Sequence, residues 1–520
     1  MPGAKPSAEG TGPVDLPDDG RLWLFAPDET QMLQVGTQLV VCLPRFGDGT
    51  EYNFLHGGSD VFTRLRLKNF KAWEDTGDIE LAPLTILFGG NSSGKSSLHQ
   101  FLLMLRQTIE SPDRRRVLHT GGDRTPVDLG GYASLLRNGN IDAPLEFELD
   151  WSRNRPLTVD YERDGTRFRG TEMGFRAAVS ATADSPPRLR VDNYEYSLTA
   201  SDSGDTLRLG SEVAAKGGYA VHADGIELIR TMGRKWPVSA PSQFHAFPED
   251  LPTRYQFLDF AADLTLALEE QLLAVNYLGP LRTQPSRTYR WSGEEVSHVG
   301  WSGENTIDAL LAGQARRFNF AVKQRTTPLQ TLVAEWLKKL GVIETFTVTP
   351  IGAGRDEYEV RVRTPGGSRE VLLTDVGFGV SQVLPVIVEA FYSAAGSTVV
   401  VEQPEIHLHP AVQAGLADLF LDAISAREGS NPRRTQFIIE SHSEHLLRRL
   451  LRRIAEERVD PADVRCYSVD PGEHGSTINA LDVDEYGNVR NWPRDFFGDP
   501  AEDLIAQSRN ARRRRRGEHG

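Results

Sequence analysis

Short apolar runs and helical apolar patterns follow one another along the chain and predict both strands and helices. Leu84 to Phe88 is a continuous apolar run, as expected for a strand that is buried on both faces. Apolar residues then recur at helical spacing, at Leu98, Phe101, Leu102, Leu105 and Ile109. A buried strand followed by an amphipathic helix predicts an α/β unit.

The last third of the chain repeats this pattern twice. Residues 397–401 and 436–439 are largely apolar, and each run precedes a helical pattern, at residues 411–427 and 444–458. We expect these units and the first one to build a single parallel sheet from both ends of the chain.

The middle of the chain has a different character. Short strand-like runs such as 145–149, 189–191 and 194–198 are separated by turn clusters, which predicts an antiparallel β-rich region. A helical apolar face follows at 256–278, and 305–341 holds two more helices. Further strands are expected at 345–349, 358–362 and 370–373. No internal repeat occurs at a fixed period.

Residues 1–19 are rich in Pro, Gly and Asp, which predicts disorder. Strand-like pieces occur at 22–25 and 38–43, and residues 63–68 alternate polar and apolar as a half-exposed strand does. These patterns divide the chain into five parts. They are an N-terminal extension (1–60), a head in two pieces (61–127 and 370–470), a β-rich then helical insertion (128–369), a small C-terminal domain (471–508) and a basic disordered tail (509–520).

The composition is that of a globular protein with more than one structural unit, since the 520 residues are 39% apolar and 25% charged. Cys42 and Cys466 form no metal or disulfide pattern, which suits a reducing compartment. We find no signal peptide and no apolar run of membrane-spanning length, so a cytoplasmic protein without a membrane partner is expected.

The net charge of −14 argues against a non-specific nucleic-acid coat protein, which would normally be basic. Contact with DNA or RNA would need a local patch. Arginines cluster at 448–449, at 452–453 and in the tail at 512–516. The tail is equally consistent with a disordered solubilising segment.

The turn between the first strand and its helix fits G-x-x-x-x-G-K-[ST] at every fixed position. Strand, glycine-rich turn and helix is the context of a phosphate-binding loop, in which backbone N–H groups surround an anion. Lys95 is expected to reach the β- and γ-phosphates, and the Ser96 hydroxyl to bind Mg²⁺. The expected nucleotide-binding residues of the loop are Gly89, Asn91, Ser92, Ser93, Gly94, Lys95, Ser96 and Ser97.

The two later strands end in polar residues of the kind that a nucleotide site needs. Glu402 ends the first strand and is the expected Mg²⁺ carboxylate, with Gln403 and Glu405 directly after it. The second strand ends in Glu440-Ser441-His442, where the histidine could hydrogen-bond a γ-phosphate. The alternative for this region is a zinc site. Its ligands would come from His407, His409, His442, His445 and Glu440.

A third element, residues 376–382, precedes a helix expected at 383–394. With Ser381 as the helix cap, Pro385 lies at the edge of the first turn, where its missing N–H costs little. A helix start beside loose glycine backbone is again an anion-binding arrangement.

The order of these motifs resembles the ABC-type ATPase heads of the SMC, RecF and overcoming-lysogenization-defect group, and most closely its prokaryotic AAA-family ATPases with a small C-terminal domain of unknown function. The resemblance lies at both ends of the chain. Its stretches are L-R-L-K-N-F-K-A-W (65–73), the phosphate loop, Y-L-G-P-L-R (277–282), D-V-G-F-G-V-S-Q-V-L-P (375–385), V-V-V-E-Q-P-E-I-H-L-H-P (399–410), F-I-I-E-S-H-S-E-H-L (437–446) and the acidic ending 482–499.

The resemblance implies an α/β fold: an ABC-type P-loop head with a mixed β-sheet core and a long inserted β-rich and helical region. It implies that Gly379, Ser381 and Gln382 are a signature motif that contacts the γ-phosphate bound by a second subunit. His442 would be the switch histidine, and ATP with Mg²⁺ would be held between two copies of the chain.

The chain departs from this group in three places. Many relatives have a catalytic glutamate where Gln403 stands, so Glu405 or His442 takes over or hydrolysis is slow. No glutamine lies between Gln107 and Gln243 to form the usual glutamine loop, although the turn at 128–131 could occupy its place. A C-terminal nuclease is not expected, since 482–484 is a lone D-x-D.

We therefore expect an ATP-driven dimeric switch in DNA-related processes or genome defence. The alternative is an ATP-loaded scaffold that regulates a separately encoded effector protein with negligible turnover. A transporter ATPase is disfavoured by the long insertion, and a small-molecule kinase by the signature and switch elements.

Overall fold

The computed structural model describes residues 32–35, 38–41, 61–122, 124–182, 188–233, 236–321, 324–473, 475–493, 496–497 and 500–515. The chain forms two units, residues 1–55 and 56–520. In the first, β1 (Met32–Val35) pairs antiparallel with β2 (Gln38–Val41). Strand β2 lies inside the strand-like piece predicted at 38–43, whereas β1 was not predicted. The disorder predicted for 1–19 and the strand predicted at 22–25 lie outside the described residues.

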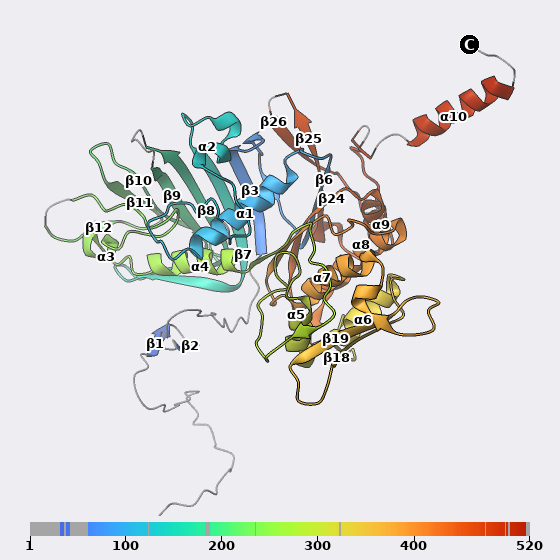
Figure 1. The fold of residues 1–520 in the computed structure, drawn as a ribbon. Helices are drawn as coiled ribbons and strands as arrows, with labels where there is room; N and C mark the ends of the chain where they lie inside the picture. The colour runs from blue at the N-terminus through green and yellow to red at the C-terminus, as the bar shows by residue number, and fades with distance from the viewer. Residues whose placement is uncertain are drawn as a thin grey trace, which may run out of the picture. The chain divides into compact units, whose positions relative to one another are not determined.

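The second unit contains the parallel sheet that the sequence predicts from both ends of the chain (Figure 1). Its strands are all parallel except the last, which returns antiparallel to its neighbour. In spatial order they are β14 (Val275–Leu278), β21 (Thr398–Glu402), β24 (Gln436–Ser441), β6 (Leu84–Gly89), β25 (Val464–Gly472) and β26 (Gly475–Ala480). The prediction of one mixed α/β core sheet is confirmed, and the predicted insertion contributes β14 to it.

Alternate residues of the parallel strands enter two separate hydrophobic cores, as the period of a strand requires. Leu87, Val400 and Ile438 lie in the core that includes α1 (Lys95–Ile109). Their neighbours along the strands enter a core formed with α7 (Phe378–Tyr392), α8 (Pro410–Ser425) and α9 (Glu444–Ala455). Burial on both faces explains why these strands appear as continuous apolar runs.

A second, antiparallel sheet packs on α1 from the other side and forms most of the predicted β-rich region (Figure 1). Phe101 anchors α1 to this sheet, because its ring contacts Phe70 of β3 at a centroid distance of 5.4 Å and Phe147 of β7 at 5.0 Å. The strands in spatial order are β11 (Tyr219–Asp224), β10 (Thr206–Val213), β9 (Leu189–Thr199), β8 (Thr166–Ala181), β7 (Leu145–Tyr161), β3 (Val61–Phe70) and β4 (Trp73–Asp75), and β5 (Ile79–Glu80) pairs with β3.

Helices and short strands complete the second unit. The helices α5 (Thr306–Ala312) and α6 (Leu329–Lys339) lie where two helices were predicted, and β18 (Thr345–Pro350), β19 (Glu357–Arg363) and β20 (Val371–Leu372) where strands were predicted. The remaining elements are α2 (Tyr132–Leu135), β12 (Ile229–Arg230), α3 (Leu251–Arg254), β13 (Tyr255–Gln256), α4 (Ala261–Leu273), β15 (Tyr289–Arg290), β16 (Arg317–Phe318), β17 (Thr327–Pro328), β22 (Arg427–Glu428), β23 (Asn431–Pro432) and α10 (Pro500–Arg515).

The helix predicted over 256–278 is wrong at its C-terminal end. Helix α4 stops at Leu273, and residues 275–278 are the edge strand β14, which pairs with β21. Val275 and Tyr277 are a β-branched and an aromatic residue, which suit a strand, and pairing with a buried strand outweighs the helical pattern.

The basic tail is helical where it is described. Residues 509–515, predicted to be disordered, form the end of α10. Arginine and alanine are strong helix formers, which accounts for the difference. Among the described residues, no helix is long and apolar enough to span a bilayer.

The contact of Phe101 with two strands of the antiparallel sheet yields a stability prediction. Phe101→Ala should lower the free energy of unfolding by about 3–5 kcal/mol, since it leaves a cavity between α1 and the antiparallel sheet. Urea denaturation followed by intrinsic fluorescence measures this. The neighbouring variant Gln100→Ala is the control, and an equal loss in both variants would contradict the assignment.

Candidate functional site

The phosphate loop lies between β6 and α1, as the motif predicts. Gly90, Asn91 and Ser92 are exposed at its rim, whereas Lys95 is 2% exposed. Lys95 Nζ donates to the backbone oxygens of Gly89 at 3.1 Å and Gly90 at 2.7 Å. Burial lowers the pKa of Lys95. The ammonium group is therefore held inside the turn, as binding of a phosphate requires.

Two glycines of the loop are needed because other parts of the chain approach closely. Gly89 has a φ of +151°, and a Cβ there would lie 2.1 Å from the backbone oxygen of Val469 in β25. Gly94 has a φ of +100°, and a Cβ there would lie 2.9 Å from Ser476 Oγ of β26. The C-terminal hairpin β25–β26 thus forms one wall of the phosphate loop.

A tryptophan upstream of the loop supports its other end. Trp73 Nε1 donates to Ser97 Oγ at 2.8 Å, and Ser97 Oγ donates to the backbone oxygen of Gly94. This chain of hydrogen bonds links β4 to the first turn of α1. Ser97 is therefore a support of the loop in this structure, and Trp73 is a residue that the sequence reasoning did not assign.

The carboxylate directly opposite the loop is Glu440, at the end of β24. Ser96 Oγ donates to Glu440 Oε2 at 2.7 Å, and Lys95 Nζ lies 3.7 Å from Glu440 Oε1. Glu440 is only 3% exposed. The sequence reasoning placed Glu440 only in the zinc alternative, although its position at a strand end beside His442 was the available signal.

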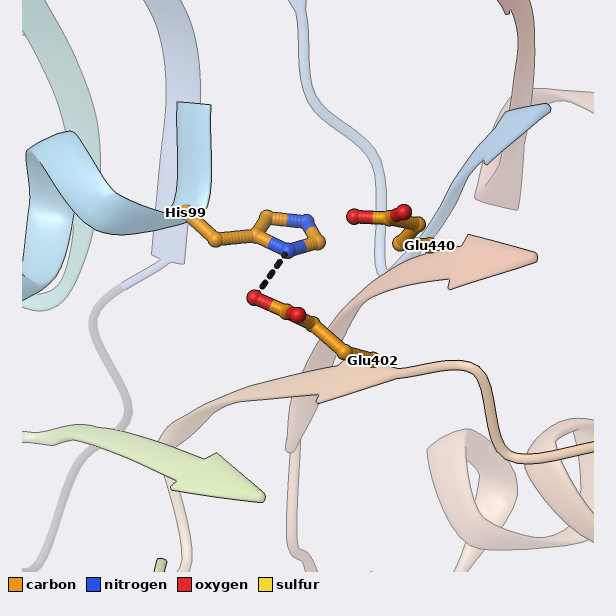
Figure 2. Close-up of side chains that lie close together, drawn as sticks. All are labelled: His99, Glu402 and Glu440. Carbon is orange, nitrogen blue, oxygen red and sulfur yellow. Dashed lines mark ion pairs between the residues drawn. The ribbon is translucent and has the colours of Figure 1, made fainter. Parts of the chain in front are cut away.

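Glu402, the predicted Mg²⁺ carboxylate, lies beside Glu440 on the neighbouring strand β21. The side chains of His99, Glu402 and Glu440 point toward one another, the first from α1 and the others from the two strands (Figure 2). His99 Nδ1 is 3.6 Å from Glu402 Oε1. His99 was missed because one histidine on an apolar helix face carries no motif.

The predicted catalytic residues Gln403, Glu405 and His442 lie together. Gln403 Nε2 is 3.4 Å from His442 Nε2, and the backbone N–H of His442 donates to Glu405 Oε1 at 2.5 Å. Burial and the nearby Lys95 lower the pKa of His442, so its ring is neutral at pH 7. Burial raises the pKa of Glu405.

Strand β14 and the loop after it add two residues, Tyr277 and Arg282, that the sequence reasoning left without a role. Arg282 Nη2 donates to the backbone oxygen of Glu402 at 3.2 Å, and burial lowers the pKa of Arg282 to about 10. Burial and the charge of Glu402 raise the pKa of Tyr277. By contrast, the turn at 128–131, considered as a glutamine-loop substitute, forms hydrogen bonds with Thr120, with Ser134 and within itself.

The predicted signature residues Gly379, Ser381 and Gln382 lie in the first turns of α7. This helix begins at Phe378, so the predicted start at 383 and the predicted capping role of Ser381 are wrong. Ser381 Oγ instead donates to the backbone oxygen of Phe378 at 2.7 Å. Pro385 therefore lies inside the helix, where it leaves the Ser381 carbonyl without its usual N–H partner.

Ser381 and Gln382 are 7% and 3% exposed, and the exposed part of this region is the turn at Gly377 and Phe378. Within the described part of the chain, no hydrogen bond joins the signature residues to the phosphate loop, Glu402 or His442. The structure therefore brings the catalytic and loop residues together but leaves the signature residues apart from them.

The described residues do not support the zinc alternative. Among them, the group that could hold a metal ion is His99, Glu402 and Glu440. His409 Nδ1 accepts the backbone N–H of Ala411 and so caps α8. His407 packs edge-on against Phe378 at 5.3 Å.

The arginines of α9, a candidate nucleic-acid patch, are engaged within the chain. Arg449 and Arg453 bind Asp418 of α8 at 2.7 Å and 2.5 Å. Arg448 and Arg452 pair with Glu444 and Glu456 on the same helix. These pairs neutralise most of the local positive charge.

The residues present fit both groups that the motif implies. Ser96, Glu440 and Glu402 offer hydroxyl and carboxylate oxygens, which Mg²⁺ prefers. The exposed loop rim with its buried lysine suits the phosphates of a nucleotide.

The sequence matches the family model described as "AAA domain, putative AbiEii toxin, Type IV TA system" over residues 84–448. The chain belongs to this AAA family. Residues 459–507 match a second model, described as "Protein of unknown function (DUF3696)". The predicted family, a prokaryotic AAA-family ATPase with a small C-terminal domain, is confirmed. The head of this AAA protein is thus a P-loop ATPase domain.

Solved structures of SMC heads are similar to this AAA protein at low identity. An SMC head bound to the C-terminal winged-helix domain of ScpA has 11% identity and a TM-score of 0.36, with 81% of this chain and 98% of that chain covered. The SMC head of Thermotoga maritima has 11% identity and a TM-score of 0.35, with 81% and 99% covered. The Pyrococcus furiosus SMC head with an extended coiled coil, bound to the C-terminal domain of ScpA, has 10% identity and a TM-score of 0.35, with 86% and 100% covered. A search of curated proteins found no match.

The wall of the phosphate loop yields a matched pair of variants. Gly89→Ala should lower the melting temperature of the nucleotide-free protein by several degrees, because its Cβ meets the Val469 backbone and its φ is unfavourable. Gly90→Ala should leave it nearly unchanged, since nothing lies within 4 Å of a Cβ there. Differential scanning calorimetry separates them, and equal melting temperatures would contradict the close approach of β25.

Proposed function

We propose that the protein binds ATP with Mg²⁺, hydrolyses it slowly, and dimerises around the nucleotide as a switch in DNA-related processes or genome defence. The observation that carries this proposal is the contact between the phosphate loop and the strand-end carboxylate, in which Ser96 Oγ donates to Glu440 Oε2 at 2.7 Å. A phosphate-binding loop that faces a buried carboxylate is what phosphoryl transfer from a nucleotide needs. The setting in genome defence rests on the description of the family, which names a toxin.

In this proposal, substrate binding uses the loop and the two strand-end carboxylates. The rim of the loop, from Gly89 to Gly94, surrounds the phosphates with backbone N–H groups. Lys95 turns from its own loop carbonyls toward the β- and γ-phosphates. Ser96 and Glu440 hold Mg²⁺, with Glu402 beside them. A bound Mg²⁺ neutralises the charge that develops on the phosphoryl oxygens.

The attacking water is positioned by the residues after β21 and β24. His442, neutral at pH 7, and the amide of Gln403 lie side by side and can both hydrogen-bond one water molecule next to them. Glu405 fixes the His442 backbone. Gln403 cannot accept a proton, so deprotonation of the water depends on His442 or Glu405, and turnover is slow.

Dimerisation in this proposal uses the N-terminus of α7. Its first turn has no side-chain cap, and Gly377 and Phe378 are exposed. Unpaired N–H groups at a helix start favour an anion, here the γ-phosphate bound by the second chain. Because Ser381 and Gln382 are buried, we assign this contact to backbone N–H groups near Gly379. DNA or RNA and a separately encoded effector are further proposed partners.

A second candidate function is an ATP-loaded scaffold with negligible turnover that regulates a partner effector. Gln403 favours this candidate, because an amide in the position of a catalytic carboxylate would preserve the ATP-bound state. Both candidates share the same binding site and dimer, and they differ only in the rate of hydrolysis.

Lys95→Ala should weaken ATP binding at least about tenfold and abolish ATP-dependent dimerisation, because it removes the cation that faces the phosphates. Isothermal titration calorimetry measures binding, and analytical ultracentrifugation with and without Mg²⁺–ATP measures the dimer. Lys338→Ala, which removes an exposed lysine of α6, is the control. A Lys95→Ala protein that dimerises with ATP as the wild type does would contradict the proposal.

Gln403→Glu should raise kcat for ATP hydrolysis at least about tenfold, because it places a carboxylate that can accept a proton beside His442. Steady-state phosphate release measures this. Gln403→Met removes the amide without adding a base and should not raise kcat. If Gln403→Glu leaves turnover unchanged, the residue does not limit hydrolysis.

A further inference from the structure

His99 is an unusual residue for the interior of a hydrophobic helix face. It is 0% exposed, and neither of its ring nitrogens makes a hydrogen bond within the described part of the chain. Leaving a buried polar group without a hydrogen-bond partner is energetically unfavourable. One side of the ring borders a small apolar cavity lined by residues such as Leu87 and Leu102, while Nδ1 faces Glu402.

The two carboxylates that the His99 ring approaches are themselves crowded. Glu402 and Glu440 are directly paired in register on adjacent parallel strands, so their side chains leave the sheet on the same face. Both are buried, and neighbouring like charges repel. Lys95 lies 3.7 Å from Glu440, whereas Arg282 donates only to the backbone oxygen of Glu402. A further positive charge close to both carboxylates would therefore be stabilising.

We propose that His99, Glu402 and Glu440 form a binding site for a divalent transition-metal ion, and that this site is formed in the nucleotide-free protein. Each side chain offers one ligand atom, and the three atoms all lie within 4.8 Å of one another. Small side-chain movements bring them to metal–ligand distances of about 2.1 Å.

The ligand set determines which ion is bound. Imidazole nitrogen is a ligand of transition metals, whereas Mg²⁺ prefers oxygen ligands and keeps several waters. One nitrogen and two carboxylate oxygens therefore select an ion such as Mn²⁺, Fe²⁺ or Zn²⁺ over Mg²⁺. The apolar side chains behind His99 limit access of water to the ring, which strengthens the metal–nitrogen bond.

This site is separate in composition from the Mg²⁺ position proposed for the nucleotide. Ser96 belongs to the nucleotide position only and His99 to the new site only, whereas Glu402 and Glu440 are common to both. The two can therefore be distinguished by variants. Because the proposal concerns protein without nucleotide, its outcome does not depend on ATP hydrolysis or dimerisation.

The test uses the full chain, stripped of metal with a chelator, and Mn²⁺ as the probe. Electron paramagnetic resonance should show one bound Mn²⁺ per chain, with an affinity at least about tenfold higher than that for Mg²⁺ in competition. Pulsed measurements should detect coupling to a histidine nitrogen. His99→Leu should weaken Mn²⁺ binding at least about tenfold and remove the nitrogen coupling. Binding of Mg²⁺ should stay as weak in this variant as in the wild type.

Leucine resembles its neighbours in volume and polarity, so His99→Leu is expected to fold, and circular dichroism checks this. Glu402→Gln should lose Mn²⁺ as His99→Leu does. Ser96→Ala and His407→Ala should keep both Mn²⁺ and the nitrogen coupling, since neither residue is a ligand of this site. The proposal is overturned if Mn²⁺ does not bind, or if it binds to His99→Leu as to the wild type.

Discussion

The candidate site depends on the parallel pairing of three strands that lie far apart in the sequence. β24 is hydrogen-bonded between β6 and β21, with Glu440 opposite Leu87 on one side and Glu402 on the other. Parallel strands end at a common edge, so this pairing places the phosphate loop and both carboxylates together. A shift of one residue in the pairing register of β24 would point the Glu440 side chain toward the other hydrophobic core. The alternation of side chains along the strands, which separates the two cores, therefore also determines which side chains meet at the edge of the sheet.

The sequence was sufficient to predict the parts of this arrangement whose signal is local. The strands of the parallel sheet are buried on both faces, and this produces the apolar runs that located Glu402 and His442. The spatial order of the strands has no such signal. Only the structure shows that β24, and not β21, lies next to β6, and hence that Glu440 faces Ser96. Strand β14 was missed because pairing with β21 outweighs a helical pattern that continues through its residues.

The loop after β21 is held against β24 by several bonds. Gln403 has a φ of +45°, an unusual backbone conformation for a residue with a side chain, and its N–H donates to the backbone oxygen of Glu440. Glu405 accepts the N–H of His442 in return. Strain of this kind persists only where surrounding contacts enforce it. The position of the Gln403 amide is thus coupled to the strand that carries Glu440, so a substitution at either residue is expected to shift the position of the other.

The hairpin β25–β26 forms a wall of the phosphate loop although it lies near the opposite end of the chain. Gly89 meets the backbone of Val469, and the backbone N–H of Ser476 donates to the oxygen of Ala72. During synthesis, the phosphate loop leaves the ribosome long before β25 and β26 do. Its surroundings are therefore completed only after these late strands have been made. The surroundings of the phosphate loop are therefore complete only in a full-length chain, because a polypeptide released before residue 464 would carry the whole phosphate-loop motif without the wall that shapes it.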